Sequence, residues 1–131
     1  IGLKDIDVVA VSQQLVPVGA LRTLSIRSRR FSLSSLPFIC TLTGLTNLEL
    51  CGSYHFGDDD LVHLTALRRL VCLVLGNARL CGDGLCYLSG LAELRELHLG
   101  NAHCGTLTTL RPLSLFTGLT ELSLNGQSSL N

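Results

Sequence analysis

The sequence predicts an α/β fold: a curved parallel sheet of about five short strands on a concave face, with short helices on the convex face. The first observation is an internal repeat, because aliphatic residues at relative positions 1, 4 and 6 recur five times, with first leucines 24 or 25 residues apart. The second is a change of period within each unit, from the spacing of three that suits a helix to the spacing of two that suits a strand. The triplets are Leu21/Leu24/Ile26, Leu45/Leu48/Leu50, Leu70/Leu73/Leu75, Leu94/Leu97/Leu99 and Leu119/Leu122/Leu124. One unit cannot bury its apolar edge alone, so we expect the units to stack into a solenoid.

The repeat organises the whole chain as one domain, residues 1–131. A leading segment, residues 1–20, precedes units that start near residues 21, 45, 70, 94 and 119. No capping motif follows the last triplet, and an uncovered stacking edge would invite association. We therefore expect the chain to be one section of a longer protein or of a large assembly.

Each predicted helix begins where a side chain can accept hydrogen bonds from free backbone amides. The candidate N-caps are Ser34 or Ser35, Asp58 or Asp59, Asp83, and Thr108 or Thr109. Gly44, Gly90 and Gly118 fall just before strands, where a helix must end and the chain must turn. Cap, helix and strand signals therefore agree with the register of the repeat.

Composition narrows the class of function. Hydrophobic residues make up 47% of the chain, yet polar residues interrupt every apolar stretch well before the roughly 18 residues that a membrane helix needs. Ten basic and ten acidic residues balance to zero net charge, which disfavours membrane and nucleic-acid partners. The six cysteines are scattered singly through the repeat, so we expect reduced thiols and an intracellular location, cytoplasmic or nuclear.

Two phrases carry a family resemblance. Asp58-Asp-Asp-Leu61-Val-His-Leu64 and Gly82-Asp83-Gly84-Leu85-Cys-Tyr-Leu88 each follow a strand leucine by about ten residues. Together with the triplets, they resemble the leucine-rich repeat family over essentially the whole chain, in its short-helix, 24-residue and cysteine-containing subclass. The resemblance implies a protein-binding solenoid and includes the repeats of F-box-type ubiquitin-ligase adaptors. The sequence departs from the family pattern where Asn or Cys is usual, at Ser53, Ala78, Ala102 and Gln127.

The alternation of a strand turns the residues between the buried leucines outward, onto the concave face. This face is predicted to bind protein, since Val71, Cys72 and Val74 offer an apolar centre and the surrounding charges offer a rim. The predicted binding residues are Arg22, Thr23, Ser25, Arg27, Asn47, Glu49, Val71, Cys72, Val74, Arg95, Glu96, His98, Glu121 and Ser123. We expect a scaffold or structural subunit of a larger complex, with a substrate-recruiting ligase adaptor as the alternative.

An RNA-associated subunit is a weaker interpretation. It depends on Arg22, Arg27, Arg29 and Arg30, which no aromatic side chains interleave for stacking on bases. We expect contact with nucleic acid only indirectly, within a ribonucleoprotein. No small-molecule substrate is expected.

Catalysis and metal binding have one candidate group, Cys72 with Glu96 and His98 on the neighbouring strand. Such side chains can ligate zinc or activate a nucleophile. Because the group would lie on an open surface and a fourth ligand at motif spacing is missing, we predict no enzyme activity, metal or cofactor.

Overall fold

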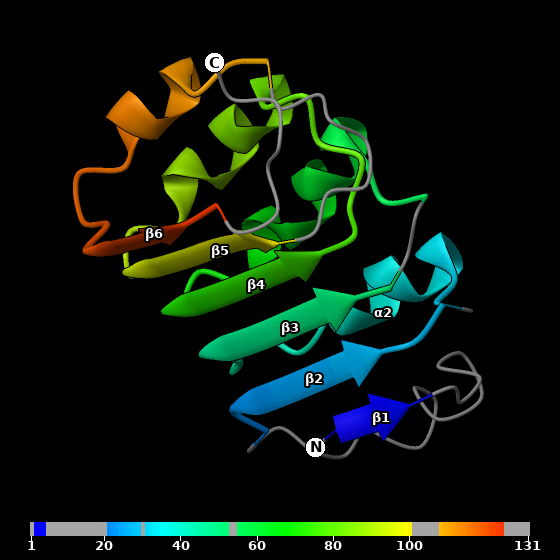
Figure 1. The fold of residues 1–131 in the computed structure, drawn as a ribbon. Coiled ribbons are helices and arrows are strands. Elements are labelled where there is room, and N and C mark those ends of the chain that lie inside the picture. Colours follow the sequence, from blue (N-terminus) through cyan, green and yellow to red (C-terminus); the bar gives the residue numbers. More distant parts are fainter. Residues whose placement is uncertain (1, 5–20, 30, 53–54, 101–107, 125–131) are drawn as a thin grey trace.

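The computed structural model describes residues 2–4, 21–29, 31–52, 55–100 and 108–124, and within them six strands form one parallel sheet in sequence order (Figure 1). The strands are β1 (Gly2–Lys4), β2 (Thr23–Arg27), β3 (Asn47–Cys51), β4 (Cys72–Gly76), β5 (Glu96–Gly100) and β6 (Glu121–Ser123). The helical segments lie on one side of this sheet and leave its other side open (Figure 1). The predicted α/β class with a parallel sheet is confirmed.

The register of the strands follows the repeat. Leu24, Leu48, Leu73 and Leu97 align as one row across β2 to β5, and the position-6 residues align as a second row. Both rows are buried against the helical layer. Each such side chain contributes about 1.5–3 kcal/mol through burial, so the triplets hold the sheet to the helices. At β6 the pattern weakens, and Leu122 is 38% exposed because no described strand continues the sheet beyond it.

The helical segments follow the strands as predicted, but most are 3-10 helices. They are η1 (Leu33–Ser35), α2 (Leu36–Ile39), η2 (Asp58–Ala66), η3 (Asp83–Gly90) and η4 (Arg111–Leu115). The reason lies in the spacing, since a 3-10 helix has three residues per turn and keeps every third residue on one face. Leu61 and Leu64 on η2 are fully buried by this arrangement, and the same spacing continues beyond the helix to Leu67 and Leu70, which are also fully buried.

The strand β1 extends the sheet beyond the five predicted strands. Its Leu3 pairs with Ile26 and therefore occupies position 6 of the triplet. Position 1 of that triplet would therefore precede residue 1, so the triplet is incomplete in this sequence. For this reason the prediction left β1 within the leading segment. Residues 5–20 of that segment lie outside the described residues.

Several helix caps differ from the prediction in the residue that supplies them. The Ser32 hydroxyl caps η1, where it accepts a hydrogen bond from the Ser34 amide at 3.3 Å. The predicted Ser35 is the N-cap residue of α2, but its side chain makes no capping hydrogen bond. At η2 the cap is Gly57, whose amide donates to the Asp60 carboxylate at 2.8 Å. At η3 the cap is Gly82, and the predicted Asp83 lies inside the first turn. At η4 the hydroxyl of the predicted Thr109 accepts a hydrogen bond from the Arg111 amide at 3.2 Å.

Asp58 stabilises the following unit rather than its own helix. Its carboxylate accepts hydrogen bonds from the amides of Cys81 at 2.8 Å, Gly82 at 3.2 Å and Gly84 at 3.1 Å. Gly82 has a φ of 108°, which favours glycine, and a Cβ on Gly84 would lie 2.4 Å from the Asp58 carbonyl oxygen. The acidic side chain of one unit therefore holds the turn that begins the next helix.

The described part of the chain contains no helix that is long and apolar enough to cross a membrane. Its five cysteines, which are Cys40, Cys51, Cys72, Cys81 and Cys86, are free thiols.

Candidate functional site

The open face is the side of the sheet that the helices leave uncovered. Its strand residues form two columns, which are Thr23, Asn47, Cys72, Glu96 and Glu121, and Ser25, Glu49, Val74, His98 and Ser123. Register places every one of these residues beside the neighbours that the sequence predicted. All ten are exposed or half-buried, so the alternation of the strands turns them outward.

At the β2–β3 end, the open face carries a hydrogen-bonded ion pair. Arg27 Nη2 lies 2.7 Å from Glu49 Oε1, and the Ser25 hydroxyl donates to Glu49 Oε2 at 2.6 Å. Partial burial raises the pKa of Glu49, but the hydrogen bonds from Ser25 and Arg27 outweigh it and hold the pKa below its usual 4.5. The Cys51 thiol also donates to Glu49, at 3.5 Å. Glu49 is therefore ionised and firmly positioned at neutral pH.

The middle of the open face is its most apolar part. Val74 and Cys72 on β4 are half-buried, and so is Val71 immediately before the strand. Val74 borders a shallow hollow of about 190 Å³, which the sheet forms with Thr23, Leu24, Ser25, Asn47, Leu48 and Glu49. An apolar wall beside polar groups in fixed positions is the kind of surface that can receive a side chain of another molecule.

The trio of Cys72, Glu96 and His98 does come together. The sulfur, a carboxylate oxygen and an imidazole nitrogen all lie within 4.8 Å of one another. Burial, together with hydrogen bonding and negative charge from Glu96, raises the pKa of the Cys72 thiol to about 11. The thiol is therefore protonated at neutral pH and is a weak nucleophile.

Arg22 and Arg95, two predicted binding residues, have a structural role at the edge where the strands begin. Arg22 Nη1 donates to the Gly44 carbonyl at 3.0 Å, and Arg95 Nη1 donates to the Gly118 carbonyl at 3.3 Å. Both arginines thus tie the turn of the next unit by the same contact. A Cβ on Gly118 would lie 2.1 Å from this guanidinium, so a larger residue there would displace the end of the Arg95 side chain from its carbonyl.

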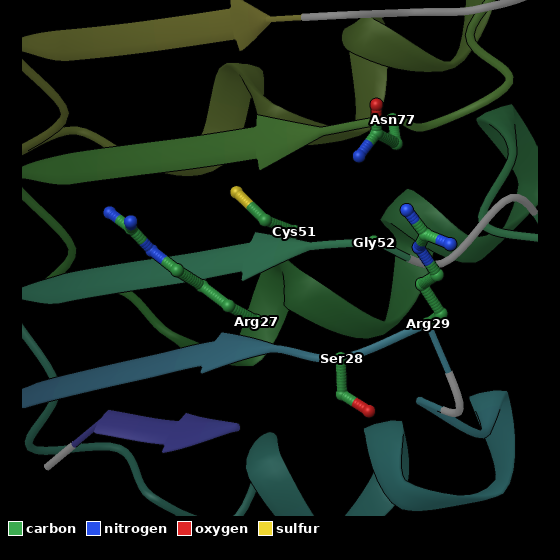
Figure 2. Close-up of a pocket in the computed structure, with 6 residues that line it drawn as sticks. All are labelled: Arg27, Ser28, Arg29, Cys51, Gly52 and Asn77. Atoms are coloured by element: carbon green, nitrogen blue, oxygen red, sulfur yellow. The ribbon is translucent and has the colours of Figure 1, made fainter. Parts of the chain in front are cut away.

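A second hollow, of about 530 Å³, lies where β2, β3 and β4 end (Figure 2). Its lining residues are Arg27, Ser28, Arg29, Cys51, Gly52 and Asn77. Arg29 and Asn77 stand on either side of Gly52, as Figure 2 shows. Asn77 has a φ of 62°, and the Gly76-Asn77 pair at the end of β4 is the sequence signal that could have identified this turn.

The predicted arginine cluster is not a set of unpaired cations. Arg22 is hydrogen-bonded to a carbonyl, Arg27 is paired with Glu49, and Arg30 lies outside the described residues. Arg29 is left at the hollow.

Sequence reasoning placed the outward residues correctly but missed the contacts among them. The Arg27–Glu49 ion pair joins neighbouring units. So does the contact between His98 Nε2 and Glu121 Oε1, which lie 3.9 Å apart. Their signal was present in the repeat, because residues 22 or 23 apart with opposite or complementary chemistry become diagonal neighbours on adjacent strands in this register.

Among solved structures, the chain is similar to the tropomodulin C-terminal domain of Caenorhabditis elegans. The two are 14% identical in sequence and superpose with a TM-score of 0.65, over 90% of this chain and 82% of that one. At this identity the likeness concerns the fold, which is a leucine-rich-repeat-like fold. No protein-family model and no curated protein matches the sequence.

Proposed function

We propose that this chain is a leucine-rich repeat solenoid that binds another protein through its open face and has no enzyme activity. The observation that carries the proposal is the uncovered side of a six-stranded sheet, with half-buried Val71, Cys72 and Val74 at its centre. Charged groups stand on both sides, with Arg27 and Glu49 toward β2 and the remaining carboxylates toward β6. An apolar centre that excludes water and a charged rim that orients the partner are the usual parts of such a surface.

The proposal includes the role of a scaffold or structural subunit inside the cell. The exposed apolar side chains of the last unit, Leu115 and Leu122, support it, because further units or a subunit of an assembly would cover them. The similarity to a tropomodulin C-terminal domain supports the leucine-rich-repeat-like fold on which this proposal depends. A ligase adaptor is the alternative, and it requires a ligase-binding segment in addition to the repeats.

The absence of enzyme activity is part of this proposal. Its support is that the strongest nucleophile candidate, Cys72, has its pKa raised to about 11 by burial and by the Glu96 carboxylate. A catalytic thiol needs the opposite environment, one that favours the thiolate.

The experiment compares two valine-to-glutamate variants as baits in a native extract. Val74→Glu places a charge at the apolar centre of the open face, whereas Val62→Glu makes the same change at a 42% exposed position on η2. We expect quantitative mass spectrometry to show a protein that wild type and Val62→Glu retain at the same stoichiometry and that Val74→Glu loses at least about tenfold. That factor corresponds to about 1.4 kcal/mol, which is ordinary for a residue at the centre of an interface.

Equal recovery of every captured protein with Val74→Glu and wild type would overturn the open face as the docking surface. Loss with Val62→Glu alone would place binding on the helical side. Fixed stoichiometry through purification would favour the scaffold, and exchangeable binding would favour the adaptor.

A further inference from the structure

Four potential metal ligands gather where β4, β5 and β6 run side by side. Cys72 and Glu96 are direct register partners, and Glu121 is the next partner of Glu96 on β6. His98 follows two residues after Glu96 and so points to the same open face. Three neighbouring units therefore contribute a thiol, an imidazole and two carboxylates to one place on the sheet.

The distances leave room for an ion among these groups. The donor atoms of Cys72, Glu96 and His98 all lie within 4.8 Å of one another. His98 Nε2 lies 3.9 Å from a carboxylate oxygen of Glu96 and 3.9 Å from one of Glu121. The two histidine-to-carboxylate separations are longer than hydrogen bonds. In a tetrahedral zinc site, bonds of about 2.0–2.3 Å put neighbouring ligand atoms roughly 3.3–3.6 Å apart, so small side-chain rotations would close the site.

We infer that Cys72, Glu96, His98 and Glu121 form a binding site for one divalent transition-metal ion of the zinc type. The ligand chemistry selects the ion, because sulfur and imidazole suit zinc, whereas magnesium and calcium take oxygen ligands alone. The strands fix the spacing of the four positions, and three of the ligands are half-buried in the sheet surface.

Electrostatics supports the same site. Glu96 and Glu121 lie directly opposite each other, and like charges in that position destabilise a sheet. The nearest guanidinium in sequence, that of Arg95, donates to the carbonyls of Ala92, Leu94 and Gly118 instead. A bound cation would remove the repulsion.

This inference goes beyond the proposed function and does not depend on it, since the metal alone is the ligand in the test. The metal-free, reduced chain is titrated with Zn²⁺ against a chromophoric chelator, and with Co²⁺ as the spectroscopic probe. We expect one ion per chain, tetrahedral ligand-field bands in the visible range and a thiolate-to-cobalt charge-transfer band in the near ultraviolet. Binding should displace the Cys72 proton, so that affinity rises with pH.

Variants identify the ligands. Cys72→Ser should abolish the charge-transfer band, and Cys72→Ser and His98→Gln should each weaken Zn²⁺ binding by about 100-fold or more, since even loss of an outer-shell partner costs about 10–100-fold. Cys51→Ser is the matched control, because Cys51 is also half-buried and its pKa is also raised to about 11, but no histidine faces it among the described residues. It should bind as wild type does.

Three results would overturn the inference: no stoichiometric binding of Zn²⁺, a charge-transfer band that survives Cys72→Ser, or equal competition by Ca²⁺ or Mg²⁺. Circular dichroism and urea unfolding check that each variant folds. If Cys72→Ser fails to fold, Glu121→Gln and His98→Gln decide the matter, and unchanged affinity in both would equally overturn the inference.

Discussion

Asp58→Ala tests whether neighbouring units are fastened by side-chain hydrogen bonds. The variant removes the acceptor of the Cys81, Gly82 and Gly84 amides, at 2.8, 3.2 and 3.1 Å. A buried hydrogen bond to a charged group contributes about 1.5–3 kcal/mol, but the bond from Cys81 is exposed and those from Gly82 and Gly84 are only partly buried, so water can replace part of each bond. At roughly 0.5–1 kcal/mol for each amide, the loss is about 2 kcal/mol, the upper range for removal of a helix cap.

The assay is urea unfolding followed by circular dichroism, with the free energy of unfolding extrapolated to water. Asp59→Ala is the control: it removes the same charge from the same turn of η2, where Asp59 is exposed and makes no hydrogen bond within the described residues. It should cost at most about 0.5 kcal/mol, the effect of one charge at a helix start. An Asp58→Ala loss no larger than that of Asp59→Ala would refute the fastening role of this carboxylate.

Two further predictions concern titratable groups on the open face. Cys72, with its pKa raised to about 11, should be alkylated by iodoacetamide at neutral pH much more slowly than the exposed Cys81, as read by peptide mass spectrometry; comparable rates would contradict this environment. Glu49→Gln should destabilise the protein at neutral pH, where the lowered pKa of Glu49 means that its ionised form favours the folded state. This difference from wild type should shrink as the pH falls through and below 4.5, because the carboxylate is then protonated in both states; a difference constant with pH would exclude the ion pair as its source.

Much of the fold could be predicted because the repeat couples local and long-range order. Once Leu73 and Leu97 occupy the same place in their units, the parallel register of β4 and β5 follows, and so do the outward positions between them. The buried rows and the pairs across the open face agree with that prediction. The kind of helix did not follow, because a run of leucines three apart suits a short α-helix and a 3-10 helix alike over two turns.

What escaped prediction depends on contacts between units. Asp58 was assigned to its own helix because cap rules consider one helix at a time, whereas its partners begin 23 residues later. In the same way, known metal-binding motifs could not have added Glu121 to the group of Cys72 and His98. These residues are separated by the length of the repeat, whereas motif rules describe ligands within one short loop.

The arginine contacts at the start of the strands have a mechanical consequence. Arg22 joins the first unit to the second, and Arg95 joins the fourth unit to the fifth, each through its side chain. The corresponding residue of the third unit is Val71, which contacts its neighbours at this edge only through backbone hydrogen bonds. We therefore expect the edge where the strands begin to flex most readily around β4, whereas Asp58 fastens the same units beyond the other end of the strands. The apolar centre of the open face lies at this joint, so a small hinge there would adjust the width of the hollow beside Val74 to the shape of whatever enters it.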